Sequence, residues 1–174
     1  MELDYTIRLA EVTDALVIWQ IIQQGIQKRK EEGSTQWQDG YPNLEVIYTD
    51  ITKKEGYVIL NNCLDVVGYV VLSCANEPAY DALKLGWLTT NKPYLVVHRL
   101  AICQQPKIKG LAYWTLQQAE VLAQKLKIES IKVDTNYDNA PMIHLFKKLN
   151  YTYCGKVYFR GSERLAFEKL TKIS

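Results

Sequence analysis

The segment that most constrains the fold of this chain is a strand that leads through a short loop into a glycine and a helix. Residues 94–102 (YLVVHRLAI) are rich in β-branched and apolar residues, and as a strand they would point side chains alternately to its two faces. A polar loop over 103–109 follows, and Gly110 then opens a helix that we expect to run to about Lys127. Strand, short loop and helix in succession indicate a sheet packed against helices.

The predicted start of this helix is suited to an anion. The first amides of a helix have no acceptor inside it, and the helix dipole adds partial positive charge there. Gly110 has no Cβ and so permits close approach to the backbone, while Lys107 and Lys109 add charge. The pattern predicts a diphosphate site built mostly from main-chain amides, although a plain tight turn would explain the same residues. Two known phosphate loops are excluded, because the chain has neither GxxxxGK(S/T) nor GxGxxG followed by an acidic residue at the next strand end.

Local patterns predict the remaining elements. Alternating apolar residues indicate strands, apolar residues three and four apart indicate helices, and glycine-containing or polar segments indicate turns. The predicted strands span 5–9, 56–60, 64–73, 130–135, 151–159 and 164–169, and the other predicted helices begin after Thr13 and after Asn43 or span 78–85 and 139–149. Thr13 is predicted to cap its helix with a hydrophobic staple between Val12 and Val17, and Asn43 is predicted to cap the second helix.

This order of elements predicts an α/β protein with a mixed sheet and helices on both faces. The sequence shows no internal repeat, low-complexity tract or linker, so we expect residues 1–174 to form one domain.

Composition excludes several function classes. The 21 basic and 19 acidic residues leave a net charge of +2 with no basic run, which argues against a nucleic-acid-binding protein. The 4 cysteines are far apart and form no CxxC pair, so we expect reduced thiols and no metal site. The first residues have no signal-peptide pattern, and the longest apolar run, at 66–72, is too short to span a membrane. We therefore expect a cytoplasmic protein that binds neither nucleic acid nor membrane.

A second motif lies downstream of the glycine. Residues 134–155 read DTNYDNAPMIHLFKKLNYTYCG, in which Asn139 precedes a helix that ends in an aromatic, basic and apolar string. Together with Lys107–Ala112 (KIKGLA), this motif resembles the GNAT superfamily of acyl-CoA-dependent N-acyltransferases, whose loop reads (Q/R)xxGx(G/A). Lys107 stands where that family has Gln or Arg, and Asn150 and Tyr151 stand where it has Gly and Phe.

The resemblance implies a fold, an activity and a set of cofactor contacts. The fold would be a mostly antiparallel sheet of six or seven strands flanked by helices. The activity would be transfer of an acetyl or other acyl group from acetyl-CoA to a primary amine by direct attack, without an acyl-enzyme or a metal. The residues expected to contact the cofactor are Leu100, Ala101, Ile102, Lys107, Ile108, Lys109, Gly110, Leu111, Ala112, Asn139 and Phe146.

Phe146 departs from the family, because many relatives carry a tyrosine there whose hydroxyl would protonate the departing thiolate. Another group or water must then donate the proton, or the thiolate leaves unprotonated, which is reasonable because a free thiol has a pKa of about 8.5. Phe146 is also explained as an ordinary core residue.

A general base is needed because an alkyl amine is mostly protonated at neutral pH. The catalytic candidates are His98, Glu77, Asp134 and Tyr137. His98 is equally explained as a packed core histidine, and the two carboxylates as solvated or capping groups. By the same resemblance, the candidates for the walls of an acceptor pocket are Trp37, Tyr41, Tyr80 and again Tyr137. Trp37 and Tyr41 could instead cover a hydrophobic edge.

Two classes of function stay open. The first is an N-acetyltransferase acting on a small-molecule or peptide amine, and the second is a domain that binds CoA or acyl-CoA with lost or weak catalysis, which Phe146 favours. The resemblance also suggests a homodimer through the C-terminal strands. The residues do not identify the acceptor or the acyl chain.

Overall fold

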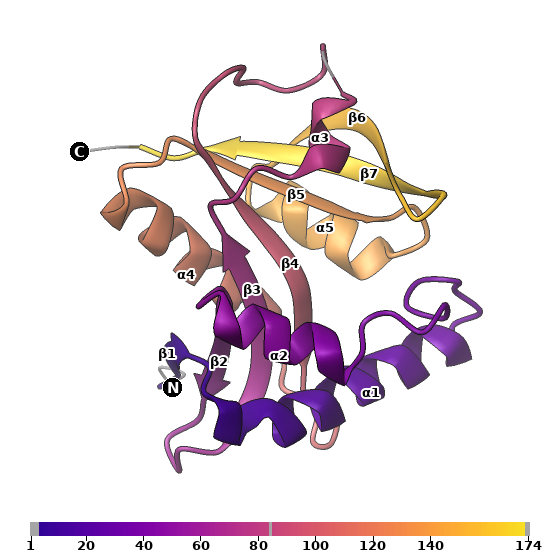
Figure 1. Cartoon of the computed structure of the whole chain (residues 1–174), viewed down its shortest axis with the longest axis vertical. Coiled ribbons are helices and arrows are strands. Elements are labelled where there is room, and N and C mark those ends of the chain that lie inside the picture. Colours follow the sequence, from indigo (N-terminus) through magenta and orange to yellow (C-terminus); the bar gives the residue numbers. More distant parts are fainter. Residues whose placement is uncertain (1–3, 84, 173–174) are drawn as a thin grey trace. The chain divides into compact units, whose positions relative to one another are not determined.

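The computed structural model describes residues 4–83 and 85–172, and within them seven strands form one sheet in the order β1-β2-β3-β4-β5-β7-β6 (Figure 1). The strands are β1 (Thr6–Leu9), β2 (Gly56–Leu60), β3 (Val66–Ser73), β4 (Tyr94–Ile102), β5 (Ser130–Asn136), β6 (Thr152–Phe159) and β7 (Ser162–Leu170). The helices are α1 (Ala15–Glu31), α2 (Leu44–Thr52), α3 (Pro78–Asp81), α4 (Leu111–Lys125) and α5 (Ala140–Lys148), and a 3-10 turn, η1 (Val12–Asp14), precedes α1.

The pairing of the strands is mostly antiparallel. The pairs β1–β2, β2–β3, β5–β7 and β6–β7 are antiparallel, and β4–β5 is parallel. The predicted α/β class with a mixed, mostly antiparallel sheet is therefore confirmed.

The chain divides into two compact units, and each is described by itself. The first consists of Met1–Leu72 and Arg99–Leu116, and the second of Ser73–His98 and Gln117–Ser174. Residues of β4 and α4 belong to both. The expectation of a single domain stays a prediction.

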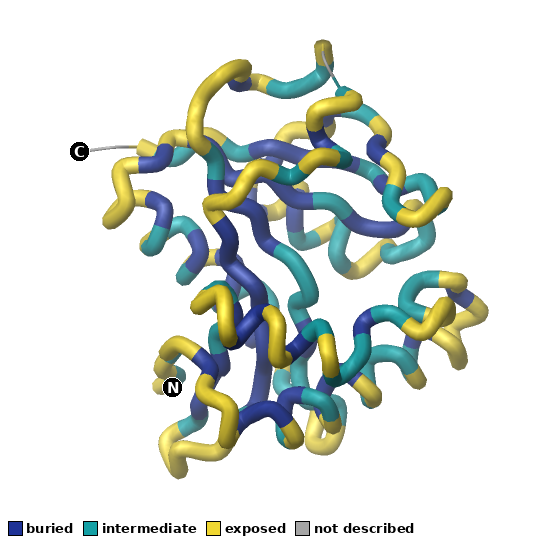
Figure 2. The backbone as a smooth tube through the Cα atoms, viewed as in Figure 1, coloured by how far each residue is buried: buried dark blue, intermediate teal, exposed yellow. Residues whose placement is uncertain are grey.

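In the first unit, helices and strands bury both faces of β2 and β3. On one face Ile18, Ile22 and Ile47 from α1 and α2 pack in one cluster with Val58 and Tyr69. On the other face lies a second cluster, formed by Ile59, Val67 and Leu111 at the start of α4. Val58 and Ile59 are neighbours in the chain, so the alternation of the strand assigns them to opposite faces. Figure 2 shows this buried backbone along the strands.

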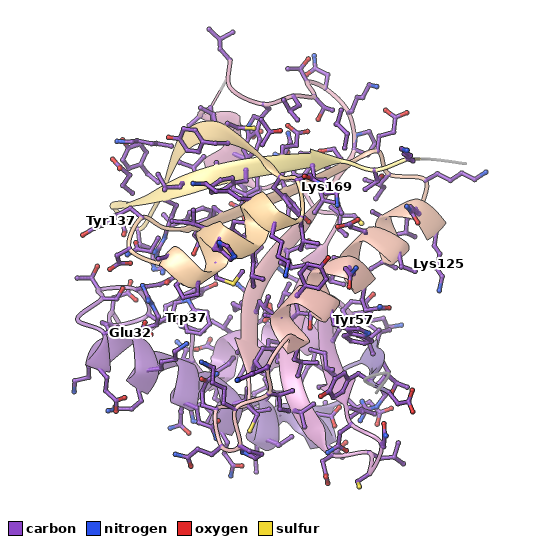
Figure 3. The ribbon with its side chains drawn as sticks, turned by 180° about the vertical axis from the view of Figure 1, so that it is seen from behind. Glu32, Trp37, Tyr57, Lys125, Tyr137 and Lys169 are labelled. Carbon is purple, nitrogen blue, oxygen red and sulfur yellow. The ribbon has the colours of Figure 1, made fainter. Side chains whose placement is uncertain are left out.

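In the second unit, α3 and α5 cover opposite faces of the strands, as the front view of Figure 1 and the rear view of Figure 3 show. On the α3 side Tyr80, Val96, Val157 and Ala166 form a buried cluster. On the α5 side Phe146 lies 5.2 Å from Phe167, measured between ring centroids. The catalytic candidates His98 and Asp134 lie on the α3 side, beside Tyr80.

The two predicted helix caps have different outcomes. The side chain of Asn43 accepts a 3.0 Å hydrogen bond from the amide of Val46, so that prediction is confirmed. The prediction for Thr13 is wrong, because Asp14 accepts from the amide of Glu11 and also pairs with Arg8 at 2.7 Å, which draws the cap into η1. The predicted staple is absent as well, since Val12 is 66% exposed.

The helix predicted over 78–85 is shorter in the structure. It ends at Asp81, and Lys84 lies outside the described residues. The Glu77 side chain caps its start by accepting from the amide of Ala79 at 3.3 Å. The sequence left Glu77 open as a general base or as a solvated or capping group, and the structure shows that it caps α3.

Candidate active site

The loop after β4 is held by other residues of the first unit at its start. The amide of Cys103 donates to the carbonyl of Val67 at 2.9 Å, and the amide of Gln104 donates to Oε1 of Gln24 on α1 at 2.7 Å. Gln104 and Lys107 then form an isolated β-bridge that closes the turn. The segment predicted to bind a diphosphate is therefore shaped by contacts that involve no ligand.

Gly110 lies where this loop meets α4. Its φ is +81°, a left-handed value, and a Cβ built there would meet no atom within 4 Å. The space beside the glycine is open, and Lys107, Lys109 and Gly110 are exposed. The glycine is thus required by backbone conformation and is accessible to a ligand.

The amides at the start of α4 have the geometry of an anion site. The first bond within the helix runs from the amide of Trp114 to the carbonyl of Gly110 at 3.0 Å. The amides of Leu111 and Ala112 precede that bond and, as the first amides of the helix, have no acceptor within the helix itself. Leu111 is fully buried and anchors the helix start, whereas its neighbours Gly110 and Ala112 are exposed and half-buried. This loop can hold a phosphate group by main-chain donors, supplemented by two lysine side chains.

The end of β4 departs from a regular strand at Arg99, whose φ is 50°. Its guanidinium forms two hydrogen bonds to the carboxylate of Asp50 on α2, through Nε at 2.9 Å and Nη2 at 2.6 Å. Nη1 donates to the hydroxyl of Tyr41. Arg99 therefore forms a structural ion pair with Asp50.

Trp37 and Tyr41 belong to the loop between α1 and α2. Trp37, labelled in Figure 3, is half-buried, and its ring carbon Cζ3 lies 3.1 Å from the position of a Cβ on Gly25. The Tyr41 hydroxyl accepts from Arg99. Both aromatic residues are therefore held in place by packing or hydrogen bonding within the first unit.

In the second unit, three of the four catalytic candidates lie in one cluster. His98 Nε2 is 3.2 Å from Oε2 of Glu77, and the Tyr80 hydroxyl donates to Oδ1 of Asp134 at 2.6 Å. The rings of Tyr80 and His98 are 6.4 Å apart between centroids, and that of Phe159 lies edge-on to His98. Residues far apart in sequence thus place an imidazole between a carboxylate and aromatic rings.

The electrostatics of this cluster separate its two carboxylates. Burial raises the pKa of the Asp134 carboxyl above its ordinary value, although His98, the hydrogen bond from Tyr80 and Arg164 each act to lower it. Burial and the Asp134 charge raise the pKa of Tyr80 well above its ordinary value, so this tyrosine stays protonated. The Glu77 and His98 side chains are 22% and 19% exposed, which leaves the pair accessible to solvent.

The backbone around Glu77 is held by a further tyrosine. The amide of Glu77 donates to the Tyr94 hydroxyl at 2.9 Å, and that hydroxyl donates to Oδ1 of Asn76 at the same distance. The Glu77 carboxylate also caps α3. The orientation of Glu77 toward His98 is therefore determined by several contacts, which is what a positioned proton acceptor requires.

The other predicted residues of the second unit lie elsewhere. Asn139 caps α5 and accepts from the amide of Met142 at 3.4 Å. Phe146 is 2% exposed and packs in the core. Tyr137, labelled in Figure 3, is 65% exposed, whereas Tyr80 is 1% exposed and supports Asp134 from within the core.

Sequence reasoning did not single out Gln24, Asp50 or Tyr69. Asp50 gave a signal, because it lies on α2 at helical spacing from the apolar Ile47 and next to Ile51, where a carboxylate must be buried and needs a partner. Gln24 gave none, since a glutamine on a partly exposed helix face is ordinary.

Two classes of feature are not found in the part of the chain that the structure describes. No group of three or more His, Cys, Asp or Glu side chains there is arranged to hold a metal ion. Across the same residues no helix combines the length and the apolar character needed to cross a bilayer.

The chain is similar to known proteins in sequence and in fold. The model of the acetyltransferase (GNAT) family matches residues 22–151. An acetyltransferase of the GNAT family from Streptococcus agalactiae is similar to the chain with 35% identity and a TM-score of 0.87, covering 97% of this chain and 96% of that one. No curated protein matches the chain.

More distant solved structures share the fold. An acetyltransferase of the GNAT family from Listeria monocytogenes has 19% identity and a TM-score of 0.77, over 97% of this chain and 95% of its own. The NatC complex bound to Gag peptide and CoA contains a chain with 10% identity and a TM-score of 0.69, over 97% of this chain and 99% of that chain.

Proposed function

The chain belongs to the acetyltransferase (GNAT) family, and on this premise we propose that it transfers an acetyl group from acetyl-CoA to a primary amine. The observation that carries the proposal is the open, left-handed Gly110 at the start of α4, where the first hydrogen bond of the helix runs from Trp114 to Gly110. This arrangement suits the diphosphate of CoA. Acetyl-CoA would supply an activated thioester. The protein would bind it and take up the proton of the acceptor amine.

The cofactor residues in the proposal are those that the resemblance implies. In the first unit, the main chain of Leu100, Ala101 and Ile102 would face the pantetheine arm, and the main chain from Lys107 to Ala112 would face the diphosphate. Lys107 and Lys109 are exposed and add positive charge at the loop. Asn139 and Phe146 in the second unit complete the proposed set.

The proposed base is the Glu77–His98 pair. An acceptor amine that arrives as an ammonium ion must lose a proton before its nitrogen can attack a carbonyl carbon. His98 would take that proton, and Glu77, 3.2 Å away, would stabilise the imidazolium that forms. Asp134 is the second candidate, and its raised pKa would allow it to hold a proton nearer neutral pH.

The proposed reaction is direct and balanced. The amine nitrogen forms a bond to the acetyl carbon, the carbon–sulfur bond breaks, and the electron pair leaves on the CoA sulfur. The nitrogen then releases its second proton to water, which gives the neutral amide. Phe146 cannot protonate that sulfur, so the thiolate leaves as such or takes a proton from water or another group. Tyr137, one of the catalytic candidates, is exposed, and we propose it as a donor of that proton besides water.

A second candidate is a domain that binds CoA without turnover. The observation that favours it is Phe146, which is 2% exposed and has no hydroxyl to offer. We further propose a single-domain cytoplasmic protein with a small-molecule or peptide amine as acceptor, with Trp37, Tyr41 and Tyr80 near or behind the acceptor. The homodimer also stays a proposal.

One experiment separates the two candidates. The protein is first titrated with acetyl-CoA in a calorimeter, and thiol release is then followed across polyamines, amino acids, aminoglycosides and peptides with free N-termini. An acetyltransferase binds acetyl-CoA and releases thiol in proportion to one class of amine. Binding without thiol release for any amine supports the binding domain, and absence of binding refutes both.

A further inference from the structure

Four buried or half-buried polar residues of the first unit form a cluster beside the end of β4, which we call the Arg99 cluster. Its members are Tyr41, Asp50, Tyr69 and Arg99. They come from the loop before α2, from α2, from β3 and from β4. Four elements of the first unit therefore meet at one guanidinium and one carboxylate.

The cluster is an ion pair removed from water. The side chains of Arg99 and Asp50 are 13% and 5% exposed, and two hydrogen bonds join them. The Tyr69 hydroxyl donates to Oδ2 of Asp50 at 2.8 Å, and burial together with Asp50 raises the pKa of Tyr69 above its ordinary range. A buried charge pair with this many hydrogen bonds holds its members in one geometry.

Arg99 has an unusual backbone for a strand residue. Its φ of 50° is left-handed, a conformation that residues with a Cβ adopt at a cost in free energy and that persists only where surrounding contacts enforce it. The three contacts of the guanidinium, to two oxygens of Asp50 and to the Tyr41 hydroxyl, are such contacts.

The residues that follow Arg99 lead directly to the proposed cofactor loop. Leu100, Ala101 and Ile102 end β4, and the amide of Cys103 is then bound to the Val67 carbonyl. With the Cys103 end held by β3, the direction of these three peptide groups depends on the dihedral angles at Arg99. A change at Arg99 would rotate their N–H and C=O groups.

We propose that Arg99 is a positioning residue for acetyl-CoA, held by Asp50 and Tyr41 so that the left-handed turn in β4 aims the main chain of residues 100–102 at the cofactor. The inference rests on the proposed function, because it assigns those peptide groups to cofactor binding. The inference also makes Asp50 on α2 a second positioning residue, because it acts on the loop only through Arg99.

The test is the dissociation constant for acetyl-CoA, measured by calorimetry on variants whose folding is checked by circular dichroism and thermal melting. Arg99→Lys keeps the charge but cannot span three contacts, and we expect its dissociation constant to rise about tenfold, as for loss of one charge-assisted hydrogen bond. Arg99→Gly adopts the left-handed conformation freely. It should therefore bind acetyl-CoA more tightly than Arg99→Val, which resists that conformation.

Two tyrosine variants form a matched pair that adds no buried charge. Tyr41→Phe removes a hydrogen bond from Arg99 itself, and we expect the dissociation constant to rise about threefold. Tyr69→Phe removes a hydroxyl from the same cluster but leaves every contact of the guanidinium, so its affinity should match the wild type. This contrast decides the matter even if Arg99→Lys fails to fold.

The outcomes separate this inference from the proposed function. If the wild type binds acetyl-CoA and Tyr41→Phe and Tyr69→Phe both match it, or folded Arg99→Val binds as tightly as Arg99→Gly, the positioning role is refuted and the proposed function stands. If the wild type does not bind acetyl-CoA, both are refuted.

Discussion

The Tyr80 hydroxyl donates a 2.6 Å hydrogen bond to Oδ1 of Asp134, although 54 positions separate the two residues in the chain. Tyr80 is 1% exposed, so the bond ties a carboxyl group on β5 to the core beneath α3. Burial raises the pKa of that carboxyl, and the hydrogen bond opposes the shift only in part. A carboxyl group of this kind makes stability depend on pH.

We expect Asp134→Asn to reveal that dependence. Because the folded pKa of Asp134 is raised, the folded protein binds this proton more tightly than the unfolded chain does. The wild type should therefore lose stability relative to Asp134→Asn as pH rises from the unfolded pKa, about 3.9, through the folded pKa, and the loss should then level off. The measurement is urea denaturation of both proteins between about pH 4 and pH 8.

Asp14 provides a control of opposite sign. The hydrogen bond from Arg8 lowers the pKa of Asp14 below its ordinary value despite some burial. The wild type should therefore hold an advantage over Asp14→Asn above the unfolded pKa and lose it as pH falls through the folded pKa. Parallel pH profiles for the two pairs would contradict the assignment of Asp134.

The proposed base makes a prediction about rate. His98→Gln should lower kcat/KM at neutral pH by about 100-fold, as is typical for loss of a general base, and the defect should shrink at high pH where more acceptor is already neutral. The measurement is a pH profile of thiol release with the best amine from the acceptor screen. His144→Gln is the matched control, because His144 is exposed on α5.

Glu77→Gln tests the other half of the pair. Gln can still accept from the Ala79 amide, so the cap of α3 is preserved while the charge next to His98 is lost. The loss of kcat/KM at neutral pH should be smaller for Glu77→Gln than for His98→Gln. A flat comparison, in which both variants match the wild type at every pH, would exclude this pair as the base.

The sequence predicted those elements and caps whose causes are local. Asn43 caps α2 as predicted, because its side chain and the Val46 amide are three residues apart. The cap at Thr13 was mispredicted because Arg8, outside the helix, pairs with Asp14 and draws the cap into η1. A contact from outside the helix overrode a sound local signal.

The candidate site was predictable in membership but not in geometry. Glu77, His98 and Asp134 were separate candidates, and the structure brings them into one cluster through the packing of α3 on the sheet. The left-handed turn at Arg99 had no sequence signal, and the Asp50 carboxylate that binds its guanidinium lies 49 positions away. Side-chain pairs at such separations depend on the tertiary fold.

Gly110→Asp tests the diphosphate loop. Its carboxylate would repel the phosphates, so affinity for acetyl-CoA should fall by at least about tenfold. Gly161→Asp is the matched control, since Gly161 also has a left-handed φ, +73°, and open space around its Cβ position. Both variants should lose similar stability, about 1 kcal/mol, from the backbone conformation, and only Gly110→Asp should lose acetyl-CoA. Equal affinities would remove the loop from the site.

Phe146→Tyr asks whether a missing hydroxyl limits catalysis. Phe146 is buried against Tyr151 and Phe167, with ring centroids 5.6 and 5.2 Å away. A hydroxyl placed in this apolar core should cost about 1–3 kcal/mol of stability if it finds no partner. We expect kcat to stay at the wild-type value, measured as thiol release below the melting temperature. A rise in kcat would show instead that the position reaches the leaving sulfur.

The last prediction concerns a close backbone approach in the second unit. A Cβ on Gly86 would lie 2.0 Å from the carbonyl oxygen of Cys154 on β6, so Gly86→Ala must displace the segment that carries it. That segment also holds Trp87 and Leu88, whose indole and amide donate to the carbonyl of Tyr80 at 3.0 Å and to the carboxylate of Glu168 at 2.5 Å.

Displacement of this segment should therefore lower both the stability of the protein and the rate of the reaction. We expect Gly86→Ala to lower the free energy of unfolding by about 1–3 kcal/mol, the usual cost of overpacking, and to lower kcat because Tyr80 and hence Asp134 lose support. Gly40→Ala, at a glycine with open space around its Cβ position, should lose only the smaller cost of its left-handed φ and keep kcat. Denaturant titration gives the first quantity and thiol release the second. If Gly86→Ala is no less stable than Gly40→Ala, β6 and this segment are not in tight contact.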